Sequence, residues 1–114
     1  MSIILKNKEI EIKDLVTELK VALMLKIEPA FAKLGLDCVI TSGHENYKHS
    51  ATHSRHYWGG AVDIRSKTVK NKHRLTINLK RRLGKDFKVI LESQGKPQEH
   101  FHISYAPTYT PKTE

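Results

Sequence analysis

The sequence predicts an α+β domain in which a small, mostly antiparallel sheet carries helices packed on one face. The first observation behind this prediction is the order of the expected elements, which runs helix, strand, long loop, strand, helix and β-hairpin. The second is the length of 114 residues, enough for one modest hydrophobic core, so we expect a single domain over residues 1–114. The third is a composition of 39% hydrophobic and 28% charged residues, which is typical of a folded globular protein rather than a disordered chain.

The first third of the chain predicts a lead-in segment followed by a long helix. Residues 3–12 contain short alternations that fit either extended structure or a simple lead-in. Asp14 is a suitable N-cap for a helix whose apolar residues keep helical spacing, and Gly35 is its natural end. Pro29 lacks a backbone donor and crowds the preceding turn, so we expect a kink or break close to Glu28.

The rest of the chain predicts strands on either side of one basic helix. Runs rich in β-branched and aromatic residues mark the strands, and polar or glycine-containing clusters separate them. The expected elements are a strand over 37–41, a polar loop over 42–55, a strand over 60–65, a helix over 68–83 ended by Gly84, and strands over 87–92 and 99–105 joined by a turn over 93–97. Residues 106–114 have no core of their own and predict a loosely packed tail.

Composition also bears on the location of the protein. No apolar run approaches the roughly 20 residues that span a bilayer, so we expect no membrane insertion. The N-terminus becomes charged before a signal-peptide core of about 7 to 15 apolar residues is complete, and we therefore expect synthesis in the cytoplasm without a signal peptide. The single cysteine, Cys38, lies in an apolar run and is expected to be a buried, inert thiol.

The formal net charge of +8 is concentrated in one segment, because nine of the lysines and arginines lie within residues 67–88. Such a surface raises encounter rates with polyanions, whether nucleic acid, anionic cell-wall polymer or anionic lipid. The simplest interpretation of the basic segment is a solvent-exposed face of a helix. No platform of base-stacking aromatic residues accompanies the charges, so we expect no specific nucleic acid as a partner.

Two separate segments carry residues with metal-binding chemistry. The first, residues 54–64, contains His56 and Asp63, and the second, residues 99–103, contains His100 and His102. Imidazole and carboxylate are ligands that Zn²⁺ takes, and three protein ligands leave a fourth position open for a water that the metal acidifies. His100 and His102 point the same way if they lie on a strand, because alternate side chains share a face.

The pattern SxHxxGxAxD over residues 54–63, with HxH over 100–102, resembles the signatures of the zinc D-Ala-D-Ala peptidases and their relatives. These relatives are the M15 peptidases, phage endolysins and the Hedgehog signalling domain, which share one fold, and the resemblance covers roughly residues 37–105. It implies a Hedgehog/DD-peptidase fold. It also implies that one Zn²⁺ ion is bound by His56, Asp63 and His102.

Peptide hydrolysis on zinc needs a carboxylate that takes a proton from the attacking water and passes it to the leaving amine. The resemblance offers two candidates. Glu99 stands three residues before His102, as the acidic residue does in the dipeptidases and endolysins, whereas Glu92 matches its more distant place in the Hedgehog-like branch. A regular strand puts Glu99 and His102 on opposite faces, so Glu99 serves only if the strand is bent or just begins there. We expect Glu99 to be the base, with Glu92 as the alternative.

Several further residues are candidates for the same site. His100 either donates a hydrogen bond to the tetrahedral intermediate, which the resemblance supports for some branches, or is a structural histidine. Ser42 and Ser54 either bind a substrate carboxylate or cap turns, and Arg55 is close enough in sequence to His56 to attract the same carboxylate. Trp58 either walls the substrate cleft or anchors the packing.

The function expected from the resemblance is a zinc peptidase that cuts peptidoglycan stem peptides, as a D-Ala-D-Ala carboxypeptidase or an L-Ala-D-Glu endopeptidase. Stem peptides carry free carboxylates and cell walls can carry further anionic polymers, which suits the basic surface. A small basic enzyme of this kind resembles a phage or prophage lysis enzyme that reaches the wall after release from the cell. Two other classes remain: a non-catalytic, zinc-binding, Hedgehog-like interaction module, and a basic nucleic-acid-binding protein.

Overall fold

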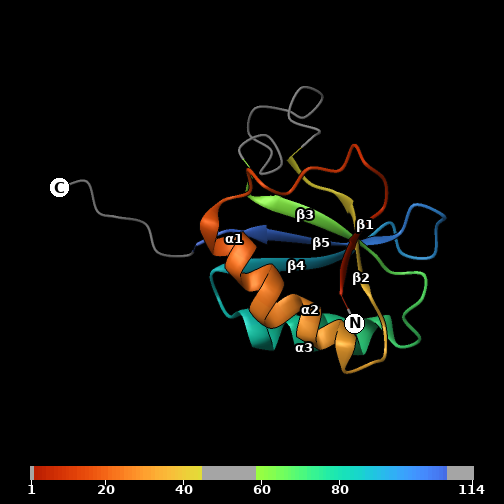
Figure 1. The fold of residues 1–114 in the computed structure, drawn as a ribbon. Coiled ribbons are helices and arrows are strands. Elements are labelled where there is room, and N and C mark those ends of the chain that lie inside the picture. Colours follow the sequence, from red (N-terminus) through yellow and green to blue (C-terminus); the bar gives the residue numbers. More distant parts are fainter. Residues whose placement is uncertain (1, 45–58, 108–114) are drawn as a thin grey trace.

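Five strands form one mixed sheet, and the helices lie together on one of its faces (Figure 1). The computed structural model describes residues 2–44 and 59–107. The strand order is β1-β2-β3-β5-β4, with β1 parallel to β2 and every other neighbouring pair antiparallel. The predicted α+β class, with a mostly antiparallel sheet, is therefore confirmed.

The elements follow the predicted order with few shifts in their bounds. The strands are β1 (Ile3–Leu5), β2 (Cys38–Ser42), β3 (Ala61–Arg65), β4 (Phe87–Glu92) and β5 (His100–Tyr105), and the helices are α1 (Thr17–Ala22), the π-helical segment η1 (Leu23–Ile27), α2 (Glu28–Ala32) and α3 (Lys72–Leu83). Most of the predicted polar loop and of the predicted tail lies outside the described residues.

The long N-terminal helix differs from its prediction at both its start and its middle. Val16, not Asp14, is the N-cap of α1, and no side chain caps that end. The expected disturbance near Glu28 is a change of helix type, because the π-helical segment η1 ends where α2 begins. Pro29 lies in the first turn of α2, at the junction with η1, where it cannot donate the backbone hydrogen bond that a residue within a continuous helix donates to the preceding turn.

Helix α3 begins later than predicted because a side chain caps it. The Asn71 side-chain oxygen accepts a hydrogen bond from the Arg74 backbone N–H at 3.0 Å, which satisfies one of the free donors at the helix start. Gly84, with φ of 82°, ends the helix in the left-handed region that glycine adopts without strain.

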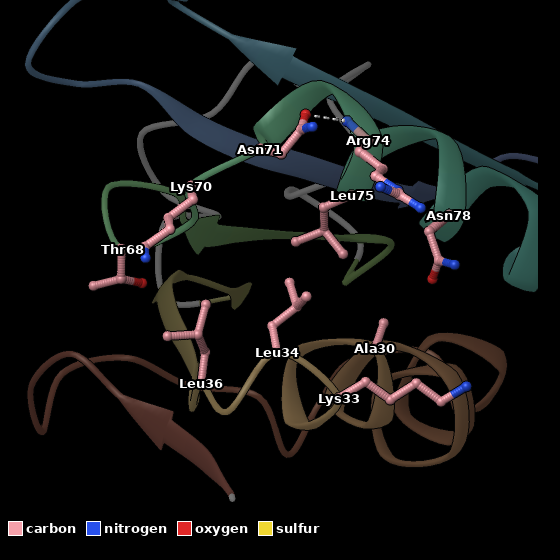
Figure 2. Close-up of a pocket in the computed structure, with 10 residues that line it drawn as sticks. All are labelled: Ala30, Lys33, Leu34, Leu36, Thr68, Lys70, Asn71, Arg74, Leu75 and Asn78. Atoms are coloured by element: carbon pink, nitrogen blue, oxygen red, sulfur yellow. Dashed lines mark hydrogen bonds between the residues drawn. The ribbon is translucent and has the colours of Figure 1, made fainter.

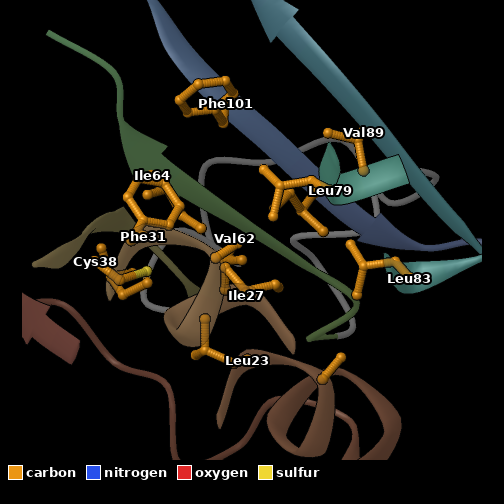
Figure 3. Packing of buried hydrophobic residues seen from close by; sticks show 14 of the residues in the cluster. Leu23, Ile27, Phe31, Cys38, Val62, Ile64, Leu79, Leu83, Val89 and Phe101 are labelled. Atoms are coloured by element: carbon orange, nitrogen blue, oxygen red, sulfur yellow. The ribbon is translucent and has the colours of Figure 1, made fainter. Parts of the chain in front are cut away.

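The hydrophobic core fills the space between the helices and the sheet (Figure 3). Phe31 of α2 meets Phe101 of β5 edge to face, with ring centroids 6.0 Å apart. Ile64 of β3 and Leu79 of α3 are fully buried in the same cluster. Since Ile64 and Phe101 point toward the helices, Asp63 and His102, their neighbours along the strands, point to the opposite face of the sheet. The core thus determines which face carries the site.

Cys38 lies in this core as a free, fully buried thiol, as predicted. Burial, together with the nearby charge of Glu28, raises the pKa of the Cys38 thiol to about 12. None of the helices within residues 2–44 and 59–107 has the length and apolar character needed to cross a membrane.

Candidate metal centre

Four side chains of the types that can bind a metal project from three neighbouring strands on the face of the sheet away from the helices. Asp63 on β3 is paired directly with His102 on β5, and Glu92 on β4 is paired with His100 on β5. His100 and His102 share this face because they are two residues apart on a regular strand. Strand pairing therefore brings together residues that lie up to 39 positions apart in the sequence.

The four side chains are close enough to share one ion. His102 Nδ1 lies 2.9 Å from Asp63 Oδ1, and His100 Nε2 lies 2.9 Å from Glu92 Oε1. The cross distances are 3.4 Å from His100 Nε2 to Asp63 Oδ1 and 3.8 Å from His102 Nδ1 to Glu92 Oε1. One ligand atom from each residue lies within 4.8 Å of all the others, so the group could hold a metal ion. Two imidazole nitrogens and two carboxylate oxygens suit a divalent transition metal.

The hydrogen bonds around His100 fix which ring nitrogen faces the cluster. Nδ1 is 2.9 Å from the carbonyl oxygen of Gln98, which can only accept, so Nδ1 carries the proton. Nε2 then faces Glu92 and Asp63, as a donor when the ring is charged and as a possible metal ligand when it is neutral.

The charge state of His100 follows from its neighbours. Burial alone lowers the pKa of His100, but the hydrogen bond to the Gln98 carbonyl and the negative charges of Asp63 and Glu92 outweigh it. The net effect raises the pKa of His100 above its ordinary value. In the absence of an ion, the cluster therefore favours a positive charge between its two carboxylates.

Access to the cluster is uneven. The side chains of Asp63, His100 and His102 are mostly buried, whereas that of Glu92 is 44% exposed. Glu92 is therefore the member of the group that water reaches most easily.

Glu99 lies apart from these four residues. Its Oε1 accepts hydrogen bonds from the Lys72 ammonium at 2.7 Å and the Ser66 hydroxyl at 2.8 Å, and its Oε2 accepts one from the Gly95 N–H at 3.1 Å. The bond from Lys72, followed by those from Ser66 and Gly95, lowers the pKa of Glu99 to about 2.

The position of Glu99 has a simple geometric cause. It precedes His100 by one residue, and β5 is regular from that point, so Glu99 extends toward the start of α3, which carries Lys72. The bend that would turn Glu99 toward His102 is absent in the described strand. The structure brings Glu92 beside the histidines and leaves Glu99 in an ion pair with the helix.

Of the five remaining predicted site residues, the structure describes only Ser42. Ser42 ends β2, is buried, and is paired with Asp63 across a register shift between β2 and β3. The predicted third zinc ligand, His56, and three candidate substrate-binding residues lie outside the described residues; these three are Ser54, Arg55 and Trp58.

Gly59 holds the start of β3 close to the segment before α1. Its φ is +80°, and a Cβ atom there would lie 2.6 Å from the Asp14 carbonyl oxygen. The Gly59 carbonyl also accepts a hydrogen bond from the Val16 N–H at 2.9 Å. This close backbone approach explains why the path into the Asp63 strand contains glycine.

Sequence reasoning missed two features near the sheet. One is the pair Lys72 and Ser66, which holds Glu99 and has no motif that marks it. The other is a second group that could hold an ion, formed by Glu11, Asp14 and His44, in which Glu11 Oε2 is 3.5 Å from His44 Nδ1. Its members come from segments some thirty residues apart, so no local spacing predicts it.

Comparisons with known proteins give this chain no family. No protein-family model matches it, and no curated protein and no solved structure matches it either.

Proposed function

We propose that this chain is a zinc-dependent peptidase that hydrolyses peptidoglycan stem peptides. The observation that carries the proposal is the contact between Asp63 and His102, 2.9 Å apart on neighbouring strands. These are two of the three residues that the resemblance to zinc D-Ala-D-Ala peptidases implies as ligands. The strand register also brings a second histidine, His100, and a carboxylate, Glu92, to the same place.

The donor atoms fit a zinc ion of ordinary geometry. Tetrahedral zinc with ligand distances of about 2.0 to 2.1 Å holds its ligand atoms roughly 3.3 Å from one another. The two proposed ligand atoms in the described residues, Asp63 Oδ1 and His102 Nδ1, lie 2.9 Å apart, which is close to this value. Asp63 and His102 would hold the ion, with His56 as the third ligand that the resemblance implies. Zinc binds carboxylates as anions and imidazoles as neutral rings, so zinc affinity should rise with pH.

The residues beside the ion suggest how the chain would act on a peptide. When bound, zinc would polarise the scissile carbonyl and acidify a water. Glu92, exposed and beside the cluster, would accept a proton from the attacking water and deliver it to the amine that leaves. His100, held by the Gln98 carbonyl, would donate through Nε2 to the oxygen on which negative charge develops.

This assignment makes Glu92 the base in place of Glu99. Glu99 has a pKa of about 2 and is held by Lys72 and Ser66, so it is a weak proton acceptor that already has its partners. A base of this kind is effective when its pKa lies near the working pH and it can reach the water. Glu92 meets the second condition, because its exposed carboxylate lies beside the proposed ion site, where the water would be bound.

The substrate class rests on the resemblance and on charge. Stem peptides end in carboxylates, and a formal net charge of +8 favours their approach. The proposal includes action on the cell wall after the protein has left the cell that made it, as a phage or prophage lysis enzyme does. The bond that we propose to be cut is either D-Ala-D-Ala or L-Ala-D-Glu.

The direct test is hydrolysis of purified peptidoglycan by the zinc-loaded protein. New amino groups should appear, their release should stop when a chelator removes the metal, and zinc should restore it. Mass analysis of the released fragments would identify the bond. Stoichiometric zinc binding without turnover on any stem peptide would contradict the proposal and would identify a non-catalytic metal-binding module instead.

A further inference from the structure

A pocket of about 530 Å³ lies between the end of α2 and the start of α3 (Figure 2). Small-molecule sites in proteins commonly occupy roughly 300 to 1,000 Å³. The pocket is formed on the helical side of the sheet, whereas the metal centre faces the other side. The two sites share no lining residue, so the function proposed for the metal centre does not account for the pocket.

The inner wall of the pocket is apolar. Leu34 and Leu75 point toward each other across it, one from the turn after α2 and the other from α3, and Leu36 lies beside them (Figure 2). Leu34 is 53% exposed, which leaves a large aliphatic side chain in water. A ligand with an apolar body would cover this surface and gain hydrophobic free energy.

The rim of the pocket is positively charged. Lys33, Lys70 and Arg74 line it, and no carboxylate from the described part of the chain is among its lining residues. Within residues 2–44 and 59–107, none of these three side chains takes part in a salt bridge. Three cations around one concavity with low-dielectric walls attract an anion more strongly than the same charges spread over a surface.

The two asparagines of the pocket present donors rather than acceptors. The Asn71 side-chain oxygen accepts from the Arg74 backbone N–H at 3.0 Å, and the Asn78 side-chain oxygen accepts from Arg82 Nε at 2.8 Å. Each oxygen thus already accepts one hydrogen bond, whereas the two NH₂ groups can donate to a ligand. Together with the Thr68 hydroxyl and the three cations, they favour a ligand group rich in acceptor oxygens.

We propose that this pocket binds a small amphiphilic anion, with a phosphate or carboxylate group attached to an aliphatic or aromatic body. The anionic group lies beside Arg74 and the asparagine NH₂ groups, the apolar body covers Leu34 and Leu75, and Lys70 adds positive charge at the other end of the rim (Figure 2). Both halves of the ligand are needed, because the pocket joins an apolar wall to a cationic rim.

Titration of the full-length, ¹⁵N-labelled protein with octyl phosphate, below the concentration at which it forms micelles, tests the proposal. Backbone amide signals from residues 30–36 and 68–78 should shift and saturate at one ligand per chain. Inorganic phosphate lacks the apolar body and octyl glucoside lacks the charge, so each should bind at least about tenfold more weakly. Equal binding of either control would overturn the proposal, as would shifts that spread over the basic surface without saturation.

Paired variants assign the binding to this pocket. The double variant Lys70→Gln/Arg74→Gln should weaken octyl phosphate binding at least about tenfold, because it removes the charge-assisted contact of Arg74 and a second cation from the rim of the pocket. The matched control Lys80→Gln/Arg81→Gln removes the same charge from exposed positions on the same helix and should bind within about twofold of the unmodified protein. Equal weakening in both variants would show attraction to net charge alone and would overturn the assignment.

Leu34→Ser provides a second test. The Leu34 side chain is exposed, so its replacement should have little effect on the stability of the fold. It should weaken octyl phosphate roughly tenfold and leave the binding of inorganic phosphate unchanged. Undiminished octyl phosphate binding in this variant would contradict the role of the apolar wall.

Discussion

Replacing Glu92 by glutamine removes a negative charge from the candidate metal centre while keeping the size of the side chain. Glu92 Oε1 lies 2.9 Å from His100 Nε2 and 3.8 Å from His102 Nδ1, so the change occurs within the reach of any substrate bound at the ion. Glutamine cannot accept a proton at neutral pH. General bases contribute about 10² to 10⁴-fold to rate, and we expect Glu92→Gln to lower kcat by a factor in that range.

The effect on zinc binding should be much smaller than the effect on turnover. Groups that surround a metal site without being its main ligands typically change metal affinity by about 10 to 100-fold. At saturating zinc, therefore, the variant should hold its ion and still hydrolyse peptidoglycan slowly. The assay is the rate of amino-group release from purified peptidoglycan, with the zinc content and circular dichroism spectrum of each variant measured alongside.

Glu99→Gln is the matched control, since it makes the same chemical change seven positions away, in the ion pair with Lys72. It should retain turnover within about tenfold of the unmodified protein, as expected for a residue that does not transfer the proton. An inactive Glu99→Gln beside a fully active Glu92→Gln would refute the reasoning and return the base to Glu99.

Three further predictions concern stability and reactivity. The pKa of Glu99 is lowered to about 2, mainly by the hydrogen bond from Lys72. Ionised Glu99 should therefore stabilise the fold fully above the ordinary pKa of 4.5, and this stabilisation should be lost as the pH falls toward 2. Acid unfolding curves of Glu99→Gln should lack this pH-dependent loss of stability. Cys38, buried and with its pKa raised to about 12, should not react with Ellman's reagent in the native protein but should react fully in denaturant, and rapid native reaction would count against the fold. Gly59→Ala should lower the free energy of unfolding in urea by more than the roughly 1 to 2 kcal/mol that a left-handed backbone costs an alanine, because the added Cβ would also lie 2.6 Å from a backbone oxygen. The control is Gly35→Ala, where φ is +72° and the space around the residue is open. This variant should lose only the free energy that the left-handed backbone costs.

The fold class was predictable because strands and helices leave periodic traces in a sequence. The strand predicted over 87–92 has the observed bounds of β4, and those predicted over 60–65 and 99–105 each begin one residue early. The parallel pairing of β1 with β2 was not predictable, since pairing partners are chosen by packing far along the chain. The start of α1 was also not predictable, because Val16 is its N-cap without a side-chain hydrogen bond, although Asp14 lies two residues earlier.

The candidate site was predictable to the extent that it follows strand alternation. The shared face of His100 and His102 follows from their spacing of two, and the same rule placed Glu99 on the other face. The choice between Glu92 and Glu99 required the register of β4 on β5, which sets Glu92 opposite His100. The choice also required the contact between Lys72 and Glu99. This contact joins the start of a helix to the start of a strand, and no local sequence pattern predicts it.

Calorimetric titration with zinc tests most directly whether Asp63 and His102 form a metal centre. The unmodified protein should bind one zinc ion per chain through this centre, and Asp63→Asn should weaken that binding by more than about 100-fold, since it removes a direct ligand rather than a supporting group. Asp37→Asn, the same change at a distant position where the side chain accepts from the Ser2 N–H, should leave the affinity unchanged. Absence of zinc binding by the unmodified protein, or equal affinity in Asp63→Asn, would contradict the proposed zinc centre.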